Sequence, residues 1–194
     1  MNKLTSMALG LALSIVASLP AVASEKYVID TEGGHYYAGF QISHLGFSIM
    51  HGRFDKISGT IDYNADNPIA SNVSVTIESG SINTNHAQRD AHLKSPDFFN
   101  AEEFPKISFV STSVEKTGEN VGKVTGNLTI LGVTKSVVLD TRLINVGANP
   151  FSKKGTAAWS ARGKIKRSDF GIKYGLPVIG DEITLLLDVE ALKQ

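Results

Sequence analysis

Alternation of apolar and polar residues is the feature that most constrains how this chain can fold. It is clearest in three stretches, where every second residue is apolar or small: 73–77, 157–166 and 183–189. Successive side chains of a β-strand point to opposite faces, so each stretch predicts a strand with one dry face. Noisier stretches of the same kind lie near 26–31, 35–44, 52–63, 106–116, 121–131 and 134–146. Turn residues separate them, so we predict an all-β chain of about eight or nine antiparallel strands.

Strands of this number and pattern can stack as a sandwich or close into a barrel. Small residues interrupt their apolar faces, namely Gly39, Gly59, Gly126, Ala157, Ala161 and Gly163. Glycine inside a strand marks either a tight bend or the close approach of another group. A barrel of about eight strands is just wide enough to hold one small ligand. A filled core and an open lumen therefore both remain as interpretations.

The first 23 residues have the composition of a secretory signal peptide. Lys3 precedes an apolar run over residues 7–19, and "PAVAS" follows with small residues at Ala21 and Ala23. The run is shorter than the roughly 20 apolar residues that cross a bilayer, and no second run of that length follows. We therefore predict cleavage after Ala23, a periplasmic product with no integral membrane segment, and one domain over residues 24–194.

Charge and cysteine content exclude several classes of function. The chain has 19 basic and 19 acidic residues, so neither nucleic acid nor an anionic membrane surface is a favoured partner. It has no cysteine, which excludes disulfides and thiol redox chemistry. It also lacks a Gly-rich phosphate loop, HExxH and GxSxG, so we predict no catalytic residue. The five histidines follow no metal-site spacing, so we predict no metal or other cofactor.

The segment around residues 84–100, "TNHAQRDAHLKSPDFFN", breaks the strand pattern. Four of its residues share one helical face by their spacing of i, i+3, i+4 and i+7: His86, Arg89, Asp90 and Leu93. Thr84 or Asn85 is available as the N-cap, and Pro96 would stop the helix. The sequence thus predicts a short helix within a loop of about 27 residues, and loops of that length are more often functional than not.

Four segments of the chain together resemble the YceI-like family of periplasmic isoprenoid-binding proteins. They are "TNHAQRDAHLKSPDFFNAEEFPKISF", "FQISHLGFSIMHGRF", "GNLTILGVTKSVVL" and "KIKRSDFGI". The likeness runs from about Tyr27 to Val189. The resemblance implies an extended, antiparallel, eight-stranded, lipocalin-like barrel, whose apolar lumen takes a long isoprenoid such as a polyprenyl phosphate or quinone.

The alternation then predicts which side chains line the lumen. These are Phe40, Ile42, Val75, Ile77, Ile107, Phe109, Leu128, Ile130, Trp159, Ala161, Leu185 and Leu187. A register shift of one residue would invert this set, because the side-chain period of a strand is two. The basic run "KIKR" at 164–167 is interpreted as the solvated outer face of a strand.

The short helix is predicted to hold the polar head of the ligand at the barrel mouth. The candidate residues are His86, Arg89, Asp90 and His92. Arg89 and His86 could donate hydrogen bonds to phosphate or quinone oxygen. The alternative is structural, with Arg89 and Asp90 pairing with neighbours to lock the long loop onto the barrel.

The sequence therefore predicts a non-enzymatic periplasmic carrier or storage protein for an apolar isoprenoid or lipid. One alternative is an enzyme that acts on an isoprenoid or lipid with His86, Asp90 or His92 as acid or base. Another is a stress-response interaction module with a filled barrel and no ligand. A homodimer is compatible with each of these interpretations.

Overall fold

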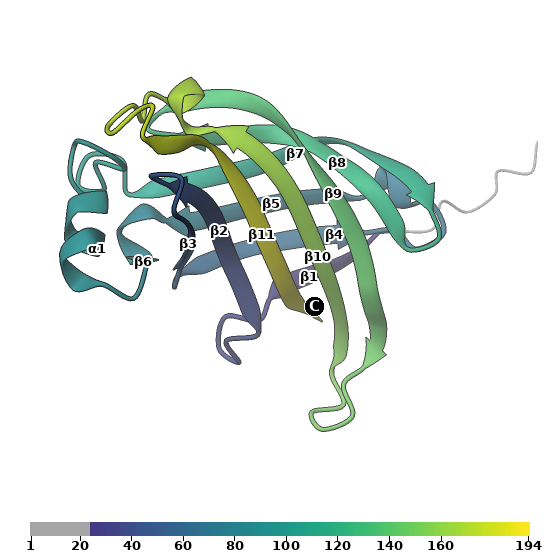
Figure 1. Cartoon of the computed structure of the whole chain (residues 1–194). Coiled ribbons are helices and arrows are strands. Elements are labelled where there is room, and N and C mark those ends of the chain that lie inside the picture. Colours follow the sequence, from purple (N-terminus) through teal and green to yellow (C-terminus); the bar gives the residue numbers. More distant parts are fainter. Residues whose placement is uncertain (1–23) are drawn as a thin grey trace, which may run out of the picture.

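Within residues 24–194, which this computed structural model describes, eight antiparallel strands close into a barrel. The ring runs β1-β4-β5-β7-β8-β9-β10-β11, and pairing of β11 with β1 closes it (Figure 1). The strands are Glu25–Ile29 (β1), Ile57–Tyr63 (β4), Asn72–Glu78 (β5), Lys106–Gly118 (β7), Val121–Ile130 (β8), Val133–Ala148 (β9), Gly155–Lys166 (β10) and Ile179–Lys193 (β11). The predicted all-β barrel is confirmed. The predicted signal peptide, residues 1–23, lies outside the described residues.

Three further strands extend the barrel wall beyond the closed ring. They are Tyr36–His44 (β2), Ser48–Phe54 (β3) and Ile82–Asn83 (β6). β2 pairs with β11, β3 pairs with β2, and β6 adds to β3. The single strand expected over 52–63 is therefore wrong, because the chain turns at Asp55 and divides it. β3 then pairs with β2 while β4 pairs with β1 and β5.

The predicted short helix is present at one end of the barrel, as α1 over Ala87–Leu93 (Figure 1). Its N-cap is His86, not Thr84 or Asn85, and the His86 ring Nδ1 accepts the Arg89 backbone N–H at 3.2 Å. Asn85 has a left-handed backbone with φ of 61°. The Thr84 hydroxyl is already used by the Arg89 and Asp90 side chains, so neither expected residue is available to cap the helix.

One of the small residues lets an aromatic ring lie against the strand. A Cβ added to Gly126 would come within 2.4 Å of the Phe109 ring. Phe109 lies on the neighbouring strand, opposite Leu128. Glycine at this position therefore accommodates a bulky neighbour in the barrel interior, as the close-approach interpretation of strand glycines expects.

Arg167 is a buried cation, although the sequence pattern placed it on a solvated face. Its side chain is 4% exposed, because β10 ends at Lys166 and the chain turns into a short 3-10 helix, Arg167–Phe170. The guanidinium donates to the backbone carbonyls of Gly180, Ile172 and Ile179 at 2.8, 3.2 and 3.2 Å. Burial lowers the pKa of Arg167, since a low-dielectric interior disfavours the charged form. Arg167 thus fixes the segment that leads into β11.

Replacing this buried cation should destabilise the fold strongly. We expect Arg167→Met to lower the free energy of unfolding by at least about 3 kcal/mol, because buried carbonyls lose charged donors. The matched control is Lys164→Met, which removes an exposed pair with Glu182 and should cost less than about 1 kcal/mol. Urea unfolding monitored by circular dichroism measures both changes. Similar small losses for the two variants would contradict the structural role of Arg167.

Candidate functional site

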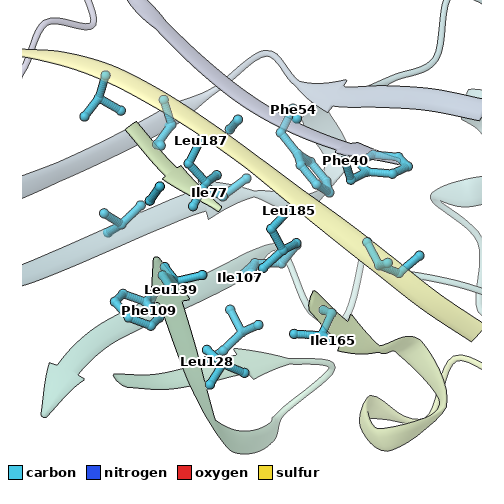
Figure 2. A pocket seen from close by; sticks show the side chains of 18 of the residues that line it. Phe40, Phe54, Ile77, Ile107, Phe109, Leu128, Leu139, Ile165, Leu185 and Leu187 are labelled. Atoms are coloured by element: carbon cyan, nitrogen blue, oxygen red, sulfur yellow. The ribbon is translucent and has the colours of Figure 1, made fainter. Parts of the chain in front are cut away.

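A long apolar cavity runs through the barrel interior. Its volume is about 560 Å³, within the range of about 300–1,000 Å³ that ligand pockets occupy. Figure 2 shows apolar side chains from several strands converging on this space, among them Phe40, Ile77, Phe109 and Leu185. Strand alternation produces this wall, because every second residue of each strand faces inward. The barrel interior is therefore an apolar channel and not a completely filled core.

The structure places all twelve predicted lumen residues in the cavity wall. Cross-strand pairing shows why they share one face. Val75 lies opposite Phe109, and Ile77 lies opposite Ile107. The predicted parity of the strands is therefore the observed one.

Several wall residues were missed by the sequence analysis. Phe54, Leu139 and Ile165 also line the cavity (Figure 2). Ile165 belonged to a regular alternating stretch, so its pattern could have identified it. Phe54 and Leu139 lie in the noisier stretches, where the inward face was harder to recognise.

The cavity is long and narrow. Val121 and Ile130, at opposite ends of β8, both line it, so it follows about 30 Å of strand at roughly 3.3 Å per residue. The volume of about 560 Å³ is therefore extended along the strands and not gathered into a compact pocket. The shape of the cavity therefore suits a linear apolar ligand.

The two ends of the lumen differ. One end, called the helix end, lies beside α1, and its wall includes the exposed His51 and Tyr174. The other end, called the turn end, lies beside the β7–β8 turn, and its wall includes the exposed Glu115, Lys116 and Asn120. Exposed residues in the wall at both ends indicate that the lumen reaches solvent at each.

Arg89 is the cation of α1 that lines the cavity. Its Nε–H donates to the Thr84 hydroxyl and its Nη2 to the Thr84 carbonyl, both at 2.7 Å. The Asp90 carboxylate accepts the Thr84 backbone N–H at 2.8 Å and also the Thr84 hydroxyl. Arg89 and Asp90 therefore hold the segment before the helix. Among residues 24–194, no group accepts a hydrogen bond from Arg89 Nη1.

The four predicted head-group residues are divided between two sides of α1. Arg89 and His92 line the lumen, whereas His86 and Asp90 line a separate shallow depression outside it. The sequence predicted that His86, Arg89, Asp90 and Leu93 share one face of the helix. They do not form one surface toward the cavity, because only Arg89 and Leu93 line it. His86 lies apart because it precedes the first helical turn as its N-cap, with an extended backbone, and the Asp90 carboxylate is turned to the Thr84 backbone N–H and hydroxyl.

His92 lies in a small aromatic group at the helix end. Its ring makes edge-on contacts with Phe98 and Tyr174, with centroids 5.0 and 4.9 Å apart. Its Nε2 lies 2.8 Å from a carboxylate oxygen of Asp97. These contacts fix the ring beside the opening of the lumen.

The described chain assembles no evident metal centre or membrane-spanning helix. Within residues 24–194, no three His, Asp or Glu side chains are grouped so that they could share an ion. Over the same residues, no helix has the length and hydrophobicity needed to cross a bilayer.

This chain is similar to known proteins in both sequence and fold. Residues 27–191 match the YceI-like domain, which confirms the resemblance of the four motifs. The chain is 43% identical over 181 residues to Protein YceI of Escherichia coli O17:K52:H18 (strain UMN026 / ExPEC), covering 93% of this chain and 94% of that protein. The crystal structure of a Campylobacter jejuni YCEI protein is 36% identical, with a TM-score of 0.69 over 78% of this chain and 90% of that one.

A further solved structure is similar in fold alone. It is a polyisoprenoid binding domain from Saccharophagus degradans implicated in plant cell wall breakdown. Its sequence is 17% identical, and its TM-score is 0.60 over 88% of this chain and 99% of that one. The closed barrel with one short helix is thus an architecture that solved structures share.

Proposed function

The chain belongs to the YceI-like family, and from that premise we propose that it is a non-enzymatic carrier of a long isoprenoid in the periplasm. The observation that carries the proposal is the narrow apolar channel along the barrel, about 560 Å³ in volume. The similar fold of a domain that binds polyisoprenoid supports a ligand of this class. The composition of residues 1–23 supports export.

Burial is the proposed source of affinity. Each Å² of apolar surface removed from water contributes about 25 cal/mol, so a long chain enclosed by the barrel is held without any specific polar contact. Ordering of the chain and loss of its free motion offset part of this gain. The carrier would therefore select for length and shape more than for chemical detail along the chain.

Arg89 is the proposed contact for the polar head of the ligand. It lines the helix end of the lumen, and its Nη1 is not engaged by any described residue. A phosphate or quinone oxygen there would accept a charge-assisted hydrogen bond. His92, beside the same opening, is the second proposed contact, while His86 and Asp90 would act by positioning the helix.

The head-group role predicts a difference between two ligands of equal chain length. We expect Arg89→Ala to weaken binding of a polyprenyl phosphate by about 1.5–3 kcal/mol, the range for a hydrogen bond to a charged group. Binding of a polyprenyl hydrocarbon without a head should hardly change. Titrations monitored by Trp159 fluorescence measure both affinities, since this residue lines the cavity.

A control variant separates ligand contact from loop locking. Thr84→Val removes the hydroxyl that both Arg89 and Asp90 use but keeps the Arg89 charge. If Arg89 contacts the head, Thr84→Val should retain the preference for the phosphorylated ligand. Equal weakening of both ligands in both variants, together with a lower melting temperature, would assign Arg89 to the loop alone.

A further inference from the structure

A cluster of exposed apolar side chains lies at the helix end of the barrel. We call it the rim patch, and it consists of Leu45, Phe47, Ile49, Tyr174 and Val178, of which Phe47 is 93% and Val178 61% exposed. Leu45 and Phe47 lie in the β2–β3 turn, Ile49 lies next to that turn in β3, and Tyr174 and Val178 lie in the segment before β11. The Leu45 backbone N–H donates to the Val178 carbonyl at 3.1 Å, so the two segments lie side by side.

The rim patch continues directly into the lumen. Tyr174 belongs to the patch and also lines the cavity. His44 and Ile179 line the cavity too, pair with each other, and adjoin Leu45 and Val178 in the chain. Apolar surface therefore leads from the outside of the protein to the opening of the channel.

Two consecutive residues of the β2–β3 turn have a left-handed backbone, as in the tight turns that join hairpin strands. Leu45 has a φ of 56° and Gly46 a φ of 73°. A left-handed backbone is uncommon for a bulky residue and carries a conformational cost. The turn keeps Phe47 almost fully exposed to water despite this cost. Burial of Phe47 in the fold is therefore not what determines this turn.

The turn end of the lumen has a different character. Its exposed wall residues are Glu115, Lys116 and Asn120. Ile69 and Ile144 are exposed near this end, where the Leu143 backbone N–H donates to the Asn120 carbonyl. The rim patch thus gathers more exposed apolar side chains at the helix end than lie at the turn end.

We propose that the rim patch docks this protein on the surface of a lipid bilayer, with the helix-end mouth of the lumen facing the hydrocarbon layer. This inference rests on the proposed carrier function, because a long isoprenoid is dissolved in the bilayer and can enter the lumen without passing through water only if the channel opens there. Exposed apolar patches mark interaction sites, and aromatic side chains favour the membrane interface. The chain has no net charge, so the docking is proposed to depend on the apolar side chains.

Vesicle experiments with the mature protein test the docking. The probe is vesicles of phosphatidylethanolamine and phosphatidylglycerol that contain a long-chain quinone. We expect the double substitution Phe47→Ser and Val178→Ser to reduce vesicle binding, measured by co-sedimentation, at least about tenfold, since two apolar side chains no longer leave water. Quinone uptake from vesicles should slow by a similar factor, while affinity for quinone delivered from cyclodextrin stays unchanged.

Phe151→Ser is the matched control. Phe151 is also 93% exposed but lies in the β9–β10 turn, which projects away from α1 (Figure 1). This variant should bind vesicles like the unmodified protein. Equal losses in the control and the double variant, or no vesicle binding by the unmodified protein, would overturn the docking proposal.

Two further outcomes separate docking from its alternatives. If sedimentation shows a dimer that the double substitution dissociates, a second copy covers the rim patch and the bilayer proposal fails. The second outcome concerns the carrier function. If vesicle binding depends on the rim patch but the protein takes up quinone from neither vesicles nor cyclodextrin, docking is upheld and the carrier function fails.

Discussion

Replacement of Ala161 by tryptophan should abolish binding of a long-chain quinone while the barrel still folds. Ala161 is a small residue of β10 in the cavity wall, paired with Leu187 of β11 and Thr141 of β9. An indole ring at this position projects into the channel and takes up part of its volume of about 560 Å³. Because the ring fills space that the fold leaves empty, the loss falls on the ligand more than on the protein.

The same substitution on the opposite face provides the control for this prediction. Ala158 lies three residues earlier in β10 and pairs with Glu190 and Asn145. Its side chain points away from the lumen, so Ala158→Trp should leave quinone affinity within a factor of about two, as expected for a surface change remote from the ligand. Fluorescence titration measures affinity, and far-UV circular dichroism verifies the fold. Full binding by Ala161→Trp would show that the ligand lies elsewhere.

The inward faces of the strands could be predicted because polar neighbours fixed their parity. Ser74 and Thr76 separate Val73, Val75 and Ile77, so only one assignment buries the apolar set. The helix was predictable for a similar reason. The spacing of its residues follows the helical period of 3.6 and not the strand period of two. Local periodicity therefore predicted both the channel wall and the element at its mouth.

Features that depend on tertiary contacts could not be read from the pattern. The division between β3 and β4 falls at Asp55 and Lys56, where neither glycine nor proline marks a turn. It is stabilised instead by Asp55, whose carboxylate accepts hydrogen bonds from Arg53 and Asn83. These partners come from two separate strands, so no local pattern reveals them.

Side-chain roles at the helix end were obscured for the same reason. Thr84 is a good N-cap by residue type, yet its hydroxyl joins Arg89 to Asp90. Arg167 follows two lysines and continues a basic run, yet the strand ends before it and buries its guanidinium. In each case hydrogen bonds made by the side chain override the local preference of its residue type.

An apolar channel open at both ends should not stay empty in a cell that contains lipids. Dry cavities take up apolar molecules, because water inside them finds few polar partners. We therefore expect the protein to be purified with its ligand when detergent is omitted. Trp159 lines the channel and packs edge-on against Tyr27 and Tyr63 at 5.6 and 5.7 Å, so its fluorescence should respond to added quinone.

Native mass spectrometry of protein purified from its own periplasm without detergent tests the carrier function most directly. The expected result is a mass above that of the chain over residues 24–194, with the excess removed by organic extraction and identified as a prenyl compound. A mass equal to the bare chain, with no change in Trp159 fluorescence when a long-chain quinone is added, would contradict it.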